Sequence, residues 1–195
     1  MKKWLGKVIP LITLGMFLVG CGEQEVSSEV VYIATLNGTP LPLDQYYIYL
    51  REEIARFELI GGADIWQTTM SGLPTLEVAK NNALEGMVRV VLTNKQSETT
   101  LLPEQIDQAQ TQAQQFWDTL PTYEQLLIPM DAIAATMEAL WLQQVIEAEL
   151  TQNYHPQERA YVFNRMFESW RAEAQVIRHA QTWDNVAEGF MTRGE

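Results

Sequence analysis

Apolar residues near the two ends of the chain follow a strand-like pattern. Val30 to Leu36 is rich in β-branched residues and is followed by Asn37-Gly38, a pair that favours a tight turn. Thr39 to Leu43 then provides a short partner strand, and Gln175 to His179 alternates briefly between polar and apolar residues. We expect the first and last of these segments to pair, because an unpaired edge at Val30 to Leu36 would promote aggregation.

Between these strands, apolar residues recur every three or four positions, which is typical of amphipathic helices. Asp44, Thr75, Thr122 and Asp131 stand where helix N-caps belong, and Pro103 suits a first helical turn. Helix breakers separate the predicted helices, which cover residues 44–60, 75–95, 103–120, 122–125, 131–152 and 157–174. The pattern predicts a mainly α fold, a single helical domain of about five helices with a small β element that pairs the N- and C-terminal strands.

The first twenty residues have the layout of a secretory signal peptide. Three lysines precede Val8 to Val19, an uncharged apolar run of twelve residues that is shorter than the roughly 20 residues of a membrane-spanning helix. Leu18 to Cys21 (LVGC) then resembles a bacterial lipobox, which implies cleavage between Gly20 and Cys21 and a lipid on Cys21. Polar residues 21–29 are interpreted as a flexible tether, so we expect a lipoprotein held at the outer face of the bacterial cytoplasmic membrane.

The charge of the chain limits its partners. The sequence carries 13 basic and 25 acidic residues, and removal of the three leader lysines leaves a net charge of −15. Such an acidic protein is not expected to bind nucleic acid. Cys21 is the only cysteine, which excludes a disulfide framework. Residues 30–195 are long enough for one domain with a real core.

Signals of enzyme chemistry are weak in this sequence. GxSxG, HExxH, P-loop and GxGxxG motifs are absent, and His155 and His179 are the only histidines. Both histidines are interpreted as solvated polar residues, and the acid pairs Glu52-Glu53 and Glu147-Glu149 as solvated charge on helix faces. We therefore expect no catalytic residue, no bound metal and no cofactor.

Three local strings resemble the N-terminal chaperone region of SurA/PrsA-type extracytoplasmic foldases. They are ATLNGTPLPLDQYYIYL, GADIW and LEVAKNNALEGMVRVVL, and the closing segment 163–186 is similar to the helix and strand that return after the parvulin prolyl-isomerase domain of that family. The resemblance covers most of the chain after the leader. It implies a peptide-binding, chaperone-like body with unfolded or partly folded exported polypeptides as partners.

The parvulin domain itself is missing from this pattern. It needs about ninety residues with a glycine-rich stretch, whereas residues 101–156 have a helical pattern and lead to the closing helix through a short loop. The resemblance therefore implies a chaperone without isomerase activity. Two alternatives remain open, namely a prolyl isomerase with an unrecognised active site and a dedicated structural subunit of a secretion or cell-wall assembly.

Large apolar residues outside the core-facing helical stripes are the candidates for peptide binding. On the first helix the core-facing stripe is Tyr47, Leu50, Ile54 and Phe57, and Tyr46, Tyr49 and Leu59 lie outside it. Trp117, beside Phe116 on the helix 103–120, also lies outside its stripe, so these four residues are the candidates for peptide binding. Other aromatic residues at helical spacing, such as Phe163 and Trp170, are interpreted as core. In the GADIW segment we expect Asp64 to cap a helical turn and Trp66 to fill the core.

The lipid assignment makes a direct prediction. Cys21→Ser removes the thiol that would carry the lipid, so metabolic labelling with radioactive fatty acid should disappear and the precursor should stay unprocessed or be shed. Two or three acyl chains are required for stable attachment, because a single chain binds a membrane only marginally. Persistent labelling of the variant would contradict the assignment of Cys21.

Overall fold

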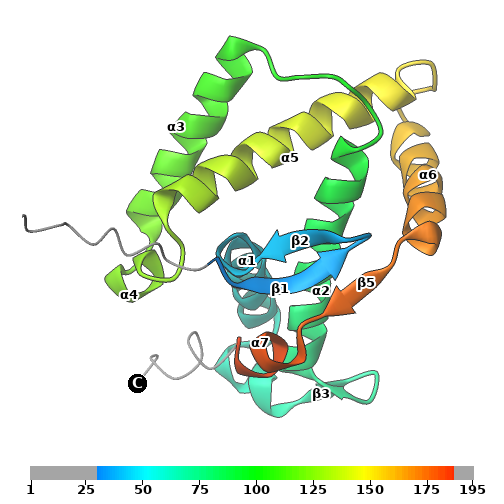
Figure 1. The fold of residues 1–195 in the computed structure, drawn as a ribbon. Coiled ribbons are helices and arrows are strands. Elements are labelled where there is room, and N and C mark those ends of the chain that lie inside the picture. The colour runs from blue at the N-terminus through cyan, green and yellow to red at the C-terminus, as the bar shows by residue number, and fades with distance from the viewer. Residues whose placement is uncertain (1–29, 187–195) are drawn as a thin grey trace, which may run out of the picture.

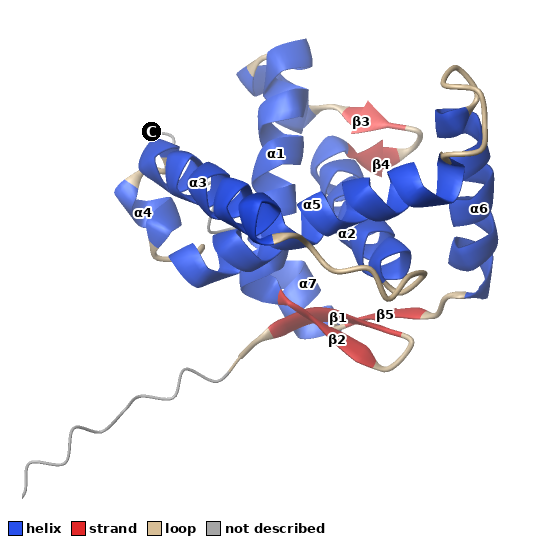
Figure 2. Ribbon diagram, turned by 90° about the horizontal axis from the view of Figure 1, so that it is seen from above, coloured by secondary structure: helices blue, strands red, loops and turns tan. Residues whose placement is uncertain are grey.

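The computed structural model describes residues 30–186, and the mainly α fold predicted from the sequence is confirmed. Helices form a body with a small antiparallel sheet at one edge (Figures 1 and 2). The predicted signal peptide of residues 1–20, Cys21 with its cleavage site after Gly20, and the tether of residues 21–29 lie outside the described residues.

The sheet joins segments from opposite ends of the chain. β1 (Tyr32–Leu36) lies in the centre, with β2 (Thr39–Pro42) on one side and β5 (Val176–Arg178) on the other, and both pairings are antiparallel. Asn37 and Gly38 both have positive φ, which gives the tight β1–β2 turn that the Asn-Gly pair predicts. The predicted pairing of the first and last strands is therefore confirmed.

Seven α-helices and one short 3-10 helix, η1, account for most of the described chain. Figure 1 shows α3 and α5 packed side by side, with α6 beside α2 at the other end of α5. The helices are α1 (Leu43–Gly61), η1 (Ala63–Gln67), α2 (Thr75–Asn94), α3 (Pro103–Thr119), α4 (Thr122–Gln125), α5 (Met130–Thr151), α6 (Arg159–Glu173) and α7 (Ala180–Asn185). The sequence did not predict α7 as a helix of its own.

Four helices begin directly after a proline, either at the expected cap residue or one residue before it. Pro42, Pro74, Pro121 and Pro129 are the residues before α1, α2, α4 and α5, and their φ angles of −52° to −68° lie in the range to which the proline ring is restricted. The residues predicted as caps consequently lie inside the first helical turns; they are Asp44, Thr75, Thr122 and Asp131. The acidic ones still face the positive end of the helix dipole.

Residues 63–74 form the connection between α1 and α2. After η1 the chain makes a two-residue hairpin of β3 (Thr69–Met70) and β4 (Leu73–Pro74). Asp64 does not cap η1, because Gly62 occupies that position. Trp66 is half-buried rather than in the core: its ring packs on Phe57 at 6.0 Å, and its Nε1 donates to Glu58 at 3.1 Å.

Two hydrophobic clusters meet at α1. The first joins the sheet, α1, α2 and α7, whereas the second joins α1 to α3, α5 and the turn before α5. Tyr46 and Leu50 of α1 lie in the first cluster, and Ile48 lies in the second. α1 is therefore buried on two faces, and it connects the two halves of the core.

Trp183 fixes the C-terminal segment to the rest of the molecule. Its ring is 6% exposed and lies between two cations, with Lys80 Nζ at 4.8 Å and the Arg178 guanidinium carbon at 4.3 Å from the ring centroid. Its Nε1 donates to Glu77 at 3.2 Å, and Glu77 also pairs with Lys80 Nζ at 2.7 Å. Trp183 therefore gives the buried ammonium of Lys80 an aromatic face in addition to its carboxylate partner.

Replacement of Trp183 tests whether its side chain holds the C-terminal segment against the rest of the molecule. Trp183→Ala removes a buried indole and leaves a cavity next to Tyr46, so it should lower the free energy of unfolding by about 3 to 5 kcal/mol. Urea denaturation followed by circular dichroism measures the change. Tyr161→Ala, at an exposed position of α6, is the control and should stay within about 0.5 kcal/mol of wild type. Equal urea midpoints for the two variants would contradict a stabilising role of Trp183.

Candidate functional site

Tyr46, one of the four predicted peptide-binding residues, lies in the core and not at the surface. Its side chain is fully buried, and its hydroxyl donates to the backbone oxygen of Lys80 at 2.9 Å. The prediction assumed one buried stripe on α1, whereas the helix packs against α2 on one face and α5 on another. A residue outside the first stripe is therefore also covered.

Tyr49 and Trp117 are half-buried, and Leu59 is exposed. Tyr49 lies against Gly86 of α2, where an added Cβ would stand 3.4 Å from its ring. Trp117 packs against the second hydrophobic cluster at the end of α3. Only Leu59, 88% exposed, has the accessibility that sequence-tolerant binding needs.

Leu59 belongs to a group of exposed apolar side chains in residues 59–73. Leu59 and Ile60 are in the last turn of α1, and Met70 and Leu73 face each other across the β3–β4 hairpin. Their exposed fractions lie between 42% and 88%. We call these four residues the apolar tip. Leu59 and Ile60 are neighbours in sequence and Met70 and Leu73 are cross-strand partners, and exposed apolar side chains that group in this way are candidates for an interaction surface.

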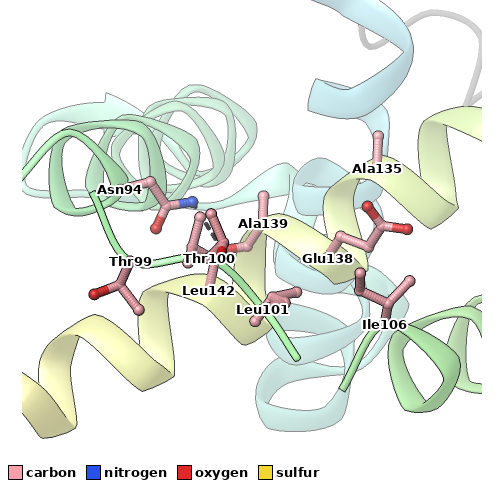
Figure 3. Close-up of a pocket in the computed structure, with 9 residues that line it drawn as sticks. All are labelled: Asn94, Thr99, Thr100, Leu101, Ile106, Ala135, Glu138, Ala139 and Leu142. Carbon is pink, nitrogen blue, oxygen red and sulfur yellow. Dashed lines mark hydrogen bonds between the residues drawn. The ribbon is translucent and has the colours of Figure 1, made fainter. Parts of the chain in front are cut away.

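A second candidate site is an open cavity of about 410 Å³ on the other side of the core, between the end of α2, the following loop, α3 and α5 (Figure 3). Its walls are mainly aliphatic: Leu101, Ile106, Ala135, Ala139 and Leu142. Its polar residues are Asn94, Thr99, Thr100 and Glu138. We call this cavity the α5 pocket.

Hydrogen bonds to α5 hold two walls of the α5 pocket in place. Asn94 Nδ2, at the end of α2, donates to the backbone oxygen of Ala139 at 2.9 Å. In the loop, Thr99 Oγ1 donates to Glu149 Oε2 at 2.6 Å, and Ser97 Oγ donates to the same oxygen at 3.3 Å. The pocket is therefore built in advance rather than formed by a loose loop.

Two acceptor groups of the α5 pocket, the Glu138 carboxylate and Asn94 Oδ1, have no partner among residues 30–186. Glu138 makes no hydrogen bond or ion pair with any residue in the range 30–186, and Asn94 Oδ1 is buried without a hydrogen-bond partner. Figure 3 shows the Glu138 carboxylate above Ile106 at one side of the pocket and the Asn94 amide at the other. An arrangement of this kind favours a ligand that carries both apolar and hydrogen-bond donor groups.

The residues considered for catalysis do not assemble into a catalytic set within the described chain. His155 is exposed, whereas His179 is half-buried, with its Nε2 3.0 Å from Thr35 Oγ1 across the sheet. The interpretation of His179 as a solvated polar residue missed this contact, which helps to attach the end of β5 to β1. Residues 30–186 contain no group of three potential metal ligands.

The acid pairs also have structural partners. Glu53 binds Arg56 and accepts from Asn82 Nδ2 at 3.1 Å, so it links α1 to α2. Glu149 is exposed but accepts from Thr99 in the loop before α3, and Glu52 is exposed next to Arg51. Glu147 is half-buried and has no side-chain partner among residues 30–186. The interpretation of these acids as solvated charge therefore missed the roles of Glu53 and Glu149.

Comparison of the chain with models of known protein families, with curated proteins and with solved structures gave no significant match. The resemblance to SurA/PrsA-type foldases therefore stays a prediction. Among the helices of the described range, none combines the length and apolar character needed to cross a bilayer.

The burial of Tyr46 leads to a pH-dependent prediction. Desolvation, with a further contribution from the Glu77 charge, raises the pKa of the Tyr46 phenol far above its usual range. An unfolded tyrosine loses its proton near pH 10, whereas the folded one keeps it, so stability should fall as the pH rises above about 10, by up to about 1.4 kcal/mol per pH unit.

Tyr46→Phe isolates this effect. The variant loses the hydrogen bond to Lys80, which should cost about 1 kcal/mol at pH 8, but it also loses the alkaline titration. The difference in unfolding free energy between wild type and variant should therefore shrink between pH 9.5 and about 11. Urea denaturation across this range measures it, with the exposed Tyr161→Phe as control. A constant difference would show that Tyr46 is not buried as described.

Proposed function

We propose that this chain is a membrane-anchored extracytoplasmic chaperone that binds unfolded exported polypeptides and has no catalytic activity of its own. The apolar tip is the observation that carries this proposal. Leu59 and Ile60 are 88% and 76% exposed in a folded chain with two well-packed clusters, so their exposure is not a consequence of a poor core. Exposed apolar side chains suit partners that differ in sequence, because apolar contact is not directional.

The chemistry of such binding favours weak and reversible complexes. Burial of about 400 Å² of apolar surface provides roughly 10 kcal/mol at ~25 cal/mol per Å². Association and ordering of the partner cost about 4 to 15 kcal/mol, so the net affinity is expected to be micromolar to millimolar. Weak binding allows release without an energy source, as a chaperone outside the cytoplasm requires.

The position of the anchor supports the same proposal. Only ten residues separate Cys21 from Tyr32, the first residue of β1, so a lipid on Cys21 keeps the domain close to the membrane where exported chains emerge. The resemblance to SurA/PrsA-type foldases, which are often lipoproteins, points to the same class of function.

Suppression of aggregation tests the proposal. The full-length protein in phosphatidylcholine nanodiscs is mixed in equimolar and tenfold amounts with a chemically denatured client that aggregates on dilution, and light scattering is followed without ATP. We expect suppression that increases with the protein concentration and is absent with empty nanodiscs. No suppression at tenfold excess would remove the chaperone function.

Two variants test whether the apolar tip is the surface that binds the client. Leu59→Ser with Ile60→Ser removes the two most exposed side chains of the apolar tip and should reduce suppression several-fold without loss of folding. Leu126→Ser is the matched control, because Leu126 is also a highly exposed leucine, 81% exposed, but lies after α4. Equal suppression by the double variant and the control would show that the apolar tip is not the client surface.

A further inference from the structure

We propose that the α5 pocket binds a lysine or arginine side chain of the client polypeptide, with the aliphatic part of that side chain against the apolar walls and its cation at Glu138. The inference rests on the proposed function and names the client chemistry that one site selects. The α5 pocket shares no residue with the apolar tip, which would bind client polypeptides without regard to their sequence.

The first argument is the state of Glu138. Its side chain lies on a half-buried position of α5, and it is the only charged group in the lining of the pocket. Several other acids that pack against neighbouring elements have a cation or hydroxyl partner: Glu77 binds Lys80, Glu124 binds Arg51 at 2.7 Å, and Glu149 binds Thr99. A half-buried carboxylate without such a partner favours binding of a cation from outside.

The second argument is the charge of the whole region. Residues 96–158, which form the loop before α3 and continue past the end of α5, contain ten Asp and Glu residues and no Lys or Arg. The nearest cation along the chain is Lys95, whose Nζ lies 3.0 Å from Thr39 Oγ1 of β2. All lining residues of the pocket except Asn94 therefore come from a segment with net negative charge, and such charge attracts basic segments and repels acidic ones.

The third argument is size and polarity. A cavity of about 410 Å³ is at the small end of the range for ligand sites, which suits one or two side chains rather than a folded partner. Lysine and arginine bury an aliphatic stem while their charged end stays hydrated or paired. Leu101, Ala139 and Leu142 provide the apolar surface for the stem, and Glu138 provides the partner for the charge.

Peptides that differ only in the charged group test this site. A fluorescein-labelled peptide of Gly, Gln and Leu with one central lysine is titrated with the full-length protein in phosphatidylcholine nanodiscs, and anisotropy gives Kd. The matched peptides carry norleucine, which keeps the aliphatic stem without the charge, or glutamate at the same position. We expect the lysine peptide to bind about tenfold more tightly than the norleucine peptide, and this preference to decrease with added salt.

Glu138→Gln should abolish the preference for lysine and leave the affinity for the norleucine peptide unchanged. Glu147→Gln is the matched control, since it removes one charge from the same helix at a residue that does not line the pocket. An equal loss of preference in both variants would overturn the assignment to Glu138 in favour of the general field. Competition by free 1,5-diaminopentane near the Kd of the peptide would overturn the assignment to a polypeptide side chain.

The outcomes separate this inference from the proposed function. Suppression of client aggregation together with equal affinity for the lysine and norleucine peptides would overturn the selection of cations while the chaperone function stands. Absence of both suppression and peptide binding would overturn the chaperone function and the inference together. A lysine preference that Glu138→Gln removes supports the inference, and together with suppression of aggregation it supports both.

Discussion

Pairing between the two ends of the chain is the constraint on which the described structure depends. β1 lies between β2 and β5, and the indole of Trp183, just beyond β5, fills the first hydrophobic cluster between two cations. Lys80 and Glu77 of α2 meet this indole, so α2 is fixed to the sheet at the same point. α1 then follows from β2 without a loop, and its second face provides the surface on which α3 and α5 pack.

Local sequence patterns predicted the elements of this fold but not their burial. The Asn-Gly turn and the helix breakers placed the strands and the main helices, because these signals act over a few residues. Tyr46 was misplaced because periodicity reveals one buried face, whereas α1 is covered on two. The contact of His179 was missed for a different reason, because its partner Thr35 is 144 residues away in sequence.

The candidate sites show the same division between local and long-range information. Leu59 was correctly placed at the surface because it follows the last stripe residue of an amphipathic helix near its glycine end. The α5 pocket was missed, since Asn94, Leu101 and Glu138 come from three segments that only the tertiary structure brings together. One sequence signal for it does exist, namely the complete absence of Lys and Arg from residues 96–158.

The central position of β1 also sets an order of events for a newly made chain. Synthesis proceeds from the N-terminus, so β1 and β2 can form their hairpin at once, whereas the other edge of β1 stays unpaired until Val176–Arg178 has been made. The long separation of these strands makes their pairing slow relative to helix formation. Completion of the domain therefore depends on the last tenth of the described chain, and a polypeptide released before that point would itself present the open strand edge of an unfolded client.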